Sequence, residues 1–375
     1  MAEVVVLGAG MVGAAIAMDL ARMGHDVTLC DRSEATLAAA TARWKLKTMQ
    51  ADLSVVTAIV KVAKGADLVM GALPSVLGLQ AARAILELGK RYVDISFLAE
   101  DPRVLDALAK DKGAIAIYDC GVAPGLSNLL AGHAARHLDP CDRIEILVGG
   151  LPVTRHWPFD YKAPFAPSDV LEEYVRPARF VVDGTPVVRE ALSEPELIDF
   201  PGVGTLEAFN TDGLRSLLDL PVPNLRERTM RYPGHIELMR VFRAVGLLDT
   251  EPIVVAGGAV VPREVLARLL FPMWGFADGE ADVTVMRVEA EGRRQGRAVR
   301  WTWDLVDRYD PETGLRSMSR TTAFPATIVA GLLLDGKFAR PGMHPPEVLA
   351  QQDGVVDLVL AGLAARGVRV AFREE

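Results

Sequence analysis

The first 121 residues alternate short β-branched runs with longer segments in which apolar residues recur every three or four positions. Runs of the first kind predict buried strands, and the longer segments predict amphipathic helices. The strand-like runs lie at residues 4–7, 25–31, 46–52, 67–74, 91–96 and 114–121. Strands and helices in this alternation predict an α/β fold with a doubly wound parallel Rossmann sheet, which binds its ligand at the carboxyl ends of the strands.

The pattern changes after residue 143, where longer alternating runs with hairpin character begin. Residues 179–188 turn on an Asp-Gly pair, and residues 281–307 alternate on both sides of a polar, Gly-rich turn. These runs predict a second α+β domain built on a mixed or antiparallel sheet. The tail returns to a helical pattern and is expected to pack on the first domain. We therefore expect a dinucleotide-binding domain at 1–121 plus about 325–375, and a substrate-binding and dimerisation domain at 122–324.

A glycine-rich turn follows the first strand, with Gly8, Gly10 and Gly13 in G-x-G-x-x-G spacing. In this motif the first glycine permits a tight turn and the second lets a pyrophosphate approach the backbone. The third allows close contact between helix and strand. The helix that starts at Met11 and Val12 offers backbone N–H groups to the phosphates. The turn therefore predicts a dinucleotide site.

The ends of the other predicted strands extend this site. Asp31 can accept both ribose hydroxyls of the adenosine half, which favours NAD, although Arg32 could instead hold the 2′-phosphate of NADP. The remaining strand-end residues form one polar rim: Asp52, Leu73 and Pro74 as cofactor contacts, Asp94 and Asp119 as candidate catalytic acids, Ser96, and Cys120. Cys120 is expected to contact the substrate and not to act as a nucleophile, because strand-end cysteines are mostly small buried hydrophobes.

A second polar cluster lies between residues 171 and 237. Its candidate substrate-binding residues are Tyr174, Arg176, Thr211, Asp212, Arg231 and Tyr232, and its candidate catalytic residue is His235. For most of these residues a surface turn or a helix cap is the alternative interpretation. His235 follows a Pro-Gly pair at a helix start, where the helix dipole lowers the pKa of an imidazole and keeps it neutral.

Composition excludes several classes of protein. The net charge is −8 over 375 residues, and no Lys/Arg-rich block exists, so nucleic acid is not an expected partner. Three scattered cysteines do not form a disulfide framework, and His133 with His137 lack a third metal ligand. Neither the apolar N-terminus nor residues 324–334 fit a signal peptide or a membrane span. We expect a cytoplasmic protein without a metal.

Five stretches together resemble the saccharopine dehydrogenase family, and its lysine 6-dehydrogenase branch most of all. They are VLGAGMVG, YVDIS, CGVAPGLSN, LEAFNTDGLRSLL and RYPGH. The resemblance implies a homodimer and NAD(P)-dependent oxidation at an amino-acid C–N bond. In that branch the ε-amino group of L-lysine is deaminated oxidatively to the semialdehyde. Relatives that act on saccharopine or carboxyspermidine-type amines carry nearly the same motifs, and a non-catalytic NAD-binding sensor is the alternative from another class.

Such chemistry requires a base, because hydride leaves a carbon beside nitrogen only after the ammonium loses its proton. A free lysine amine has a pKa of about 10.4, so the two strand-edge aspartates and His235 are the candidates. Either arginine of the second cluster could bind a substrate carboxylate in bidentate fashion, and the two tyrosines would close the site. We therefore expect the RYPGH segment to form a substrate corner that faces the nicotinamide across a cleft between the domains.

Overall fold

The computed structural model describes residues 1–163 and 167–375. The chain forms two compact units, of which the first comprises Met1–Arg136 and Ser319–Arg369, and the second comprises His137–Met318 and Val370–Glu375. The sequence-based boundaries at 121 and 325 differ from these limits because the helix at 126–137 packs with the first unit.

The first unit is an alternation of strands and helices. Its elements are β1 (Glu3–Leu7), α1 (Met11–Arg22), β2 (Asp26–Asp31), α2 (Glu34–Trp44), β3 (Lys47–Gln50), α3 (Val56–Ala63), β4 (Leu68–Gly71), α4 (Ser75–Glu87), β5 (Arg91–Asp94), a 3₁₀ turn (Pro102–Leu105), α5 (Asp106–Asp111), β6 (Ile115–Ile117), α6 (Leu126–His137), α10 (Ser317–Leu334), β17 (Gly342–His344), α11 (Pro346–Leu349) and α12 (Val355–Ala365).

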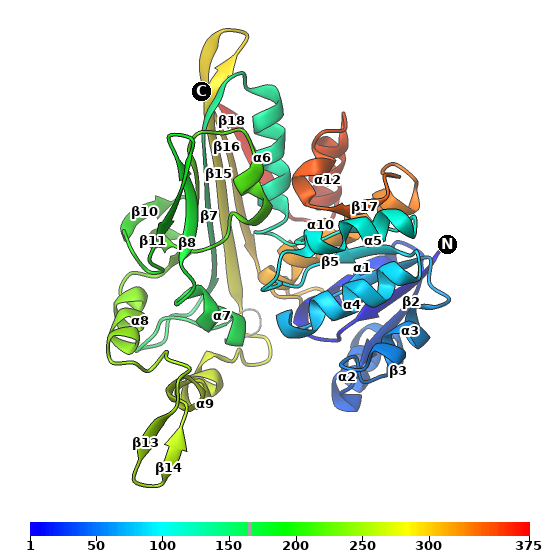
Figure 1. Cartoon of the computed structure of the whole chain (residues 1–375), viewed down its shortest axis with the longest axis horizontal. Helices are drawn as coiled ribbons and strands as arrows, with labels where there is room; N and C mark the ends of the chain where they lie inside the picture. The colour runs from blue at the N-terminus through cyan, green and yellow to red at the C-terminus, as the bar shows by residue number, and fades with distance from the viewer. Residues whose placement is uncertain (164–166) are drawn as a thin grey trace. The chain divides into compact units, whose positions relative to one another are not determined.

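These strands form one parallel sheet in the order β17-β6-β5-β4-β1-β2-β3. Figure 1 shows part of this sheet, with β17, β5, β2 and β3 labelled among the helices of the unit. The order reverses between β1 and β4, as in doubly wound dinucleotide-binding sheets. The predicted fold class is confirmed, and each of the six predicted strands is present. The seventh strand, β17, comes from the tail and pairs with β6. Its residues, Gly342, Met343 and His344, include no β-branched side chain, so the sequence does not mark them as a strand.

The tail is held to the first unit by a buried ion pair. Arg366, directly after α12, donates through Nε to both carboxylate oxygens of Asp19 on α1, at 3.0 and 2.8 Å. Thr327 on α10 also donates to Asp19, whose exposed fraction is only 5%. Because an unpaired buried carboxylate is costly, this network fixes α10 and α12 against α1.

The second unit is built on long strands. Its elements are β7 (Cys141–Pro152), α7 (Pro167–Glu173), β8 (Ala178–Val182), β9 (Thr185–Arg189), β10 (Glu196–Phe200), β11 (Gly204–Asn210), a 3₁₀ turn (Arg215–Asp219), β12 (Leu225–Arg231), α8 (His235–Ala244), β13 (Ile253–Val255), β14 (Gly258–Val260), α9 (Pro262–Trp274), β15 (Asp282–Arg294), β16 (Arg297–Arg308) and β18 (Val370–Glu374).

Nine of these strands form a mixed sheet whose main path runs β10-β11-β12-β7-β15-β16-β18. Off this path, β8 pairs with β12, and β9 pairs with β8. Among the described residues of this sheet, β12 and β7 pair in parallel and every other strand pair is antiparallel. The two predicted hairpins are present: β8–β9 turns on Asp183-Gly184 and β15–β16 on Gln295-Gly296. Both turns have positive φ at both residues, the geometry that favours Asp-Gly and similar pairs.

The last strand corrects the predicted assignment of the whole tail to the first domain. β18 pairs antiparallel with β16, and Phe372 contacts Trp301 and Trp303 at ring-centroid distances of 5.8 and 5.1 Å. The chain therefore returns to the second sheet for its last residues, because the exposed edge of β16 and its tryptophans offer a partner for a short apolar strand.

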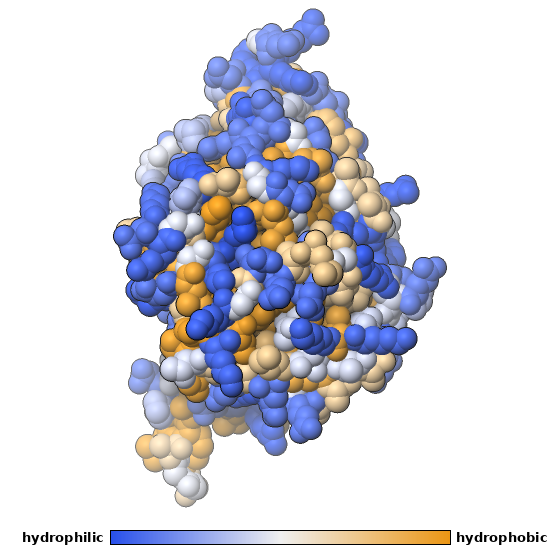
Figure 2. Space-filling model, turned by 90° about the vertical axis from the view of Figure 1, so that its right-hand side faces the viewer, coloured by the Kyte–Doolittle hydropathy of each residue, from blue (hydrophilic) through white to orange (hydrophobic). Residues whose placement is uncertain are grey.

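Helices α7, α8 and α9 of the second unit share one apolar core that includes Tyr174, Ile236, Leu270 and Trp274. Between α8 and α9 the chain forms the β13–β14 hairpin, which is a separate two-stranded sheet. Its apolar side chains are exposed, with Val254 the most so at 88%, and they are visible at the lower end of Figure 2. Within the described residues, every helix is too short or too polar to cross a bilayer.

Candidate active site

The Gly8–Gly13 turn has the geometry that its spacing predicts. Gly8 adopts a φ of +100°, and a side chain there or at Gly13 would clash with the backbone carbonyl of Ala72 or of Gly8. At Gly10, by contrast, a Cβ would meet no atom within 4 Å. Gly10 is therefore not required by packing within the chain, and the open space beside it fits a bound phosphate.

Helix α1 begins at this turn without a competing anion. Gly10 is its N-cap, no side chain caps it, and its first turn contains no acid. Met11 and Val12 form that first turn, where backbone N–H groups and the positive end of the helix dipole attract phosphate. The residues present therefore fit a dinucleotide.

Asp31 lies at the end of β2 and is tied to this turn. One carboxylate oxygen accepts the N–H of Ala9 and the other accepts the N–H of Ser33, each at 2.8 Å. These bonds fix the carboxylate and leave each oxygen a further lone pair for a ribose hydroxyl. Arg32, the next residue, is exposed. The acid that favours NAD and the arginine that could hold the 2′-phosphate of NADP are therefore adjacent in the chain.

The other predicted cofactor contacts lie at the same strand edge or in adjacent turns. Leu73 is buried, and Pro74 is the N-cap of α4. Asp52 is exposed and accepts the N–H and hydroxyl of Ser54, whose hydroxyl bond is the main cause of its lowered pKa. A local turn therefore accounts for Asp52 without a ligand.

Asp94 ends β5 at the carboxyl edge of the sheet and has no exposed surface. Its Oδ1 accepts the N–H of Ser96 at 2.9 Å. Burial raises the pKa of Asp94 to about 6, with an additional increase from the Asp119 carboxylate and opposing hydrogen-bond effects from Ser96 and Tyr92. A carboxyl group with such a pKa is ionised at neutral pH and close to the range that suits proton transfer.

Asp119 and Cys120 lie beside Asp94, as expected for neighbouring strand ends. Asp119 is buried with a φ of 50°, and the N–H of Cys120 donates to the Asp94 carbonyl at 2.9 Å. Burial, together with the charges of Asp119 and Asp94, raises the pKa of the Cys120 thiol. The thiol is therefore protonated at neutral pH, in line with a contact role and not a nucleophilic one.

His235 begins α8 in the second unit and is 2% exposed. Its Nδ1 lies 3.0 Å from the carbonyl oxygen of Phe159, and its Nε2 lies 2.8 Å from the hydroxyl of Tyr174. A carbonyl can only accept, so Nδ1 carries the proton and Nε2 accepts from Tyr174. Burial lowers the pKa of His235 to about 3, and the charge of Arg231 contributes. The imidazole is neutral, as predicted, but burial is the main cause, and both nitrogens have partners inside the unit.

Arg231 also points into this core. Its Nη2 donates to Glu173 at 2.9 Å and its Nη1 to the Met230 carbonyl at 3.0 Å, while its guanidinium lies 4.7 Å from the centre of the Tyr161 ring. The Tyr161 ring in turn lies 4.8 Å from the His235 ring. The predicted carboxylate ligand is therefore already paired with an acid of its own chain.

Tyr232 lies on the opposite side of the sheet. It belongs to a different apolar cluster, with Leu147 and Met230, and its hydroxyl donates to the Pro152 carbonyl at 3.0 Å. The expectation that Tyr174 and Tyr232 close one site is therefore wrong, because successive residues at the end of a strand face opposite sides. Arg176 follows α7 and is partly exposed.

Thr211 and Asp212 belong to a buried polar group around Glu227. The Thr211 hydroxyl lies 2.8 Å from Glu227 Oε2 and 2.9 Å from the Thr229 hydroxyl. Asp212 is paired with Arg179, whose Nε and Nη2 both donate at 2.8 Å. Burial raises the pKa of Glu227 to about 8, with smaller increases from Glu173 and Asp212.

Glu227, Arg179, Tyr161 and Glu173 were not predicted as site residues from the sequence. One signal was available: in the strand LRERTMR, alternation places Glu227, Thr229 and Arg231 on one face. The contacts of Tyr161 and Arg179 depend on distant segments and have no local signal.

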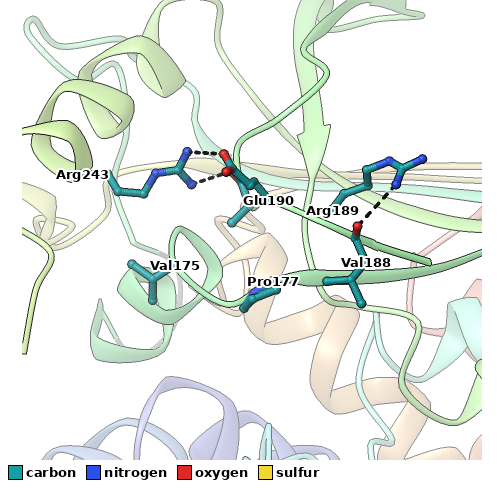
Figure 3. A pocket seen from close by; sticks show the side chains of 7 residues that line it. Val175, Pro177, Val188, Arg189, Glu190 and Arg243 are labelled. Carbon is teal, nitrogen blue, oxygen red and sulfur yellow. Dashed lines mark hydrogen bonds and ion pairs between the residues drawn. The ribbon is translucent and has the colours of Figure 1, made fainter. Parts of the chain in front are cut away.

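A surface hollow of about 460 Å³ lies in the second unit, between the residues after α7, the end of β9 and α8. It is lined by Val175, Pro177, Val188, Arg189, Glu190, Ala191 and Arg243. Figure 3 shows Arg243 turned toward Glu190, with 3.4 Å between Nη2 and Oε2. The hollow is lined by none of the predicted site residues, and its charged side chains have ion-pair partners, since Arg243 pairs with Glu190 and Arg189 with Glu194.

The first unit has the strand order, the glycine turn and the strand-end acid of dinucleotide-binding enzymes, and the second unit adds a mixed sheet. Together these features define a two-domain oxidoreductase. Residues 4–117 match the saccharopine dehydrogenase NADP-binding domain, and residues 121–368 match the saccharopine dehydrogenase C-terminal domain. The chain therefore belongs to the saccharopine dehydrogenase family, as its motifs predicted, and uses a nicotinamide cofactor.

Individual relatives agree with this assignment. Carboxyaminopropylagmatine dehydrogenase of Synechocystis sp. is 25% identical over 374 residues, which span 92% of both chains. The mitochondrial alpha-aminoadipic semialdehyde synthase of Bos taurus is 24% identical over 75% of this chain, a match that spans only 38% of the bovine protein. The structure of the L-Glu-forming saccharopine dehydrogenase of Saccharomyces cerevisiae superposes over the whole of both chains with a TM-score of 0.82 at 19% identity, which shows the shared fold.

Proposed function

We propose that this enzyme oxidises a C–N bond of an amino-acid-derived amine, with Asp94 as the base. The observation that supports this most strongly is the position of Asp94 at the carboxyl edge of the dinucleotide-binding sheet, with a pKa of about 6. An ionised carboxylate at that edge can take the proton that an ammonium must lose before oxidation.

The cofactor would be held by the Gly8–Gly13 turn and the start of α1, with Asp31 at the adenosine ribose. When bound, the nicotinamide ring accepts the hydride. Asp94 takes the proton from the amine, and the same carboxylate can later activate the water that hydrolyses an imine. Asp119 is the alternative base, and the protonated Cys120 thiol is proposed as a substrate contact.

In the second unit, the contacts of Arg231 and His235 change the proposed roles. Both side chains are committed to Glu173 and to Tyr174 with Phe159, so we assign them to shaping the unit. Arg176, which is partly exposed, becomes the preferred candidate for binding a substrate carboxylate.

The substrate class proposed first is a secondary amine that carries a carboxylate. Support comes from the Synechocystis relative, which matches this chain over 92% of both lengths. The second candidate is the primary ε-amine of L-lysine, which the RYPGH and CGVAPG motifs favour through their resemblance to lysine 6-dehydrogenases. Both substrates require the same base and hydride transfer.

The test is to add saccharopine, carboxyaminopropylagmatine or L-lysine to the purified protein with NAD or NADP, and to follow the absorbance of the reduced cofactor. Turnover of a secondary amine alone supports the first candidate, and turnover of lysine alone supports the second. The Asp94→Asn variant serves as the control and should bind reduced cofactor normally while losing turnover by at least ~100-fold. Absence of turnover with every amine would contradict the proposal.

A further inference from the structure

A gap in the sheet lies directly beside Asp94. Gly71 on β4 is the register partner of Asp94 on β5. A side chain at Gly71 would clash with the hydroxyl of Tyr92 and with Oδ1 of Asp94, and its Cβ would lie 2.8 Å from Asp94 Cγ. The phenol oxygen and the carboxylate therefore border the same space, which exists only because residue 71 has no side chain.

The hydroxyl of Tyr92 borders this gap from the same strand as Asp94. The two residues are separated by one position on β5, so their side chains share a face of the sheet. Both have no exposed surface, and the Tyr92 ring is packed among apolar residues such as Leu7 and Ile85. Phenylalanine would satisfy that packing equally well, so packing does not explain the hydroxyl.

Several buried polar atoms at Asp94 and its neighbours can still form hydrogen bonds. Among the described residues, the Tyr92 hydroxyl, the Ser96 hydroxyl and Asp94 Oδ2 lack a hydrogen-bond partner of good geometry. Buried polar atoms are usually paired, and exceptions cluster where a protein does chemistry. The Tyr92 hydroxyl is nevertheless close enough to Asp94 to favour the ionised carboxylate.

We propose that Tyr92 is a positioning residue for Asp94, whose phenol, in the gap left by Gly71, orients the carboxylate and stabilises its charge. This inference rests on the proposed function, in which Asp94 is the base. The other titratable groups that face Asp94 are Asp119 and Cys120, from the segment after β6. Asp119 acts in the opposite direction to the phenol, since its charge raises the pKa of Asp94.

The decisive measurement is the titration of Asp94 itself. Protein labelled with ¹³C at aspartate carboxyl carbons is titrated by NMR, and the Asp94 signal is the one missing from Asp94→Asn. In Tyr92→Phe, the apparent pKa of Asp94 should rise by about one pH unit, the value of one hydrogen bond to a charged group. The acidic limb of the kcat/KM profile should move by the same amount.

Tyr118→Phe is the matched control. Tyr118 lies in the same core, and its hydroxyl is also buried and lacks a partner of good geometry among the described residues. The three atoms nearest to a side chain at Gly71, by contrast, belong to Tyr92 and Asp94. This variant should leave the Asp94 titration unchanged. An unchanged Asp94 pKa in folded Tyr92→Phe, or an equal shift in Tyr118→Phe, would overturn the inference.

Failure of this inference can be distinguished from failure of the proposed function. If Asp94→Asn retains turnover, Asp94 is not the base, whatever its titration shows. If Asp94→Asn is inactive and Tyr92→Phe titrates like the wild type, Asp94 remains the base, and only the role of Tyr92 is refuted.

Discussion

Glu227 makes the stability of the second unit dependent on pH in a way that one substitution can reveal. The side chain is 4% exposed, and burial, together with Glu173 and Asp212, raises its pKa to about 8 from an ordinary value of 4.5. Between these two values the folded protein keeps a proton that the unfolded chain has lost. The stability contributed by this proton is complete below pH 4.5 and is lost as the pH rises through 8.

His235 has the opposite effect over a lower range. Its pKa is about 3 in the folded state and 6.5 in its ordinary state, so its contribution is present above pH 6.5 and is lost as the pH falls through 3. From pH 4.5 to 6.5 the pH dependences that Glu227 and His235 give to the unfolding free energy cancel. Of these two contributions, only that of Glu227 still changes with pH above 6.5. At about 1.4 kcal/mol per pH unit, Glu227 lowers the unfolding free energy by about 2 kcal/mol between pH 6.5 and 8.

Glu227→Gln removes this titration while it preserves the shape of the side chain. We expect the unfolding free energy of the variant to lack the ~2 kcal/mol decline that the wild type shows between pH 6.5 and 8. Urea unfolding followed by tryptophan fluorescence suits the measurement, since Trp157, Trp274, Trp301 and Trp303 lie in the second unit. Glu264→Gln on the exposed side of α9 is the control. A parallel decline in Glu227→Gln and the wild type would refute the reasoning.

Three further predictions concern the first unit. Gly10→Ala should unfold at the wild-type Tm but bind the dinucleotide at least ~10-fold more weakly, whereas Gly13→Ala should lose about 1–3 kcal/mol of stability. The reason is that a side chain at Gly13 clashes within the chain and one at Gly10 does not. Thermal unfolding and cofactor titration distinguish the two variants. Asp31→Ser should weaken NAD binding by about 10-fold and reduce discrimination against NADP, measured by the fluorescence of each reduced cofactor. Arg366→Met should cost about 3 kcal/mol in urea unfolding, because it leaves the buried Asp19 carboxylate without its cation, and Asp19→Asn in the same chain should restore part of the loss.

The sheet of the first unit could be predicted from sequence because its information is local. Each strand is a β-branched run, and Gly8 and Gly13 are required by contacts close along the chain or one strand away. The position of Asp94 at the carboxyl edge of this sheet could be predicted for the same reason, since the carboxyl ends of parallel strands meet at one edge. Strands β17 and β18 could not be predicted in this way, because each is short and pairs with a strand far away in the sequence.

The interior of the second unit could be predicted only in part. That His235 is neutral follows from its residue type and position, but its partners Tyr174 and Phe159 lie 61 and 76 residues away. A single sequence contains no rule that pairs such distant residues. The opposite orientations of Arg231 and Tyr232, by contrast, follow from strand periodicity once Leu225–Arg231 is recognised as a strand.

The clusters around Asp94 and His235 differ in how their hydrogen-bonding capacity is used, and this difference favours Asp94 over His235 as the proposed base. A base must have an unoccupied lone pair for the proton that it accepts. His235 has both nitrogens bonded within its unit, and protonation would place a second buried charge beside Arg231. Among the described residues, Asp94 Oδ2 has no partner, and protonation would remove a charge that burial already disfavours. The RYPGH corner therefore joins α7 and α8 to the loop that contains Phe159, and these contacts support the proposal that the base lies at the carboxyl edge of the first sheet.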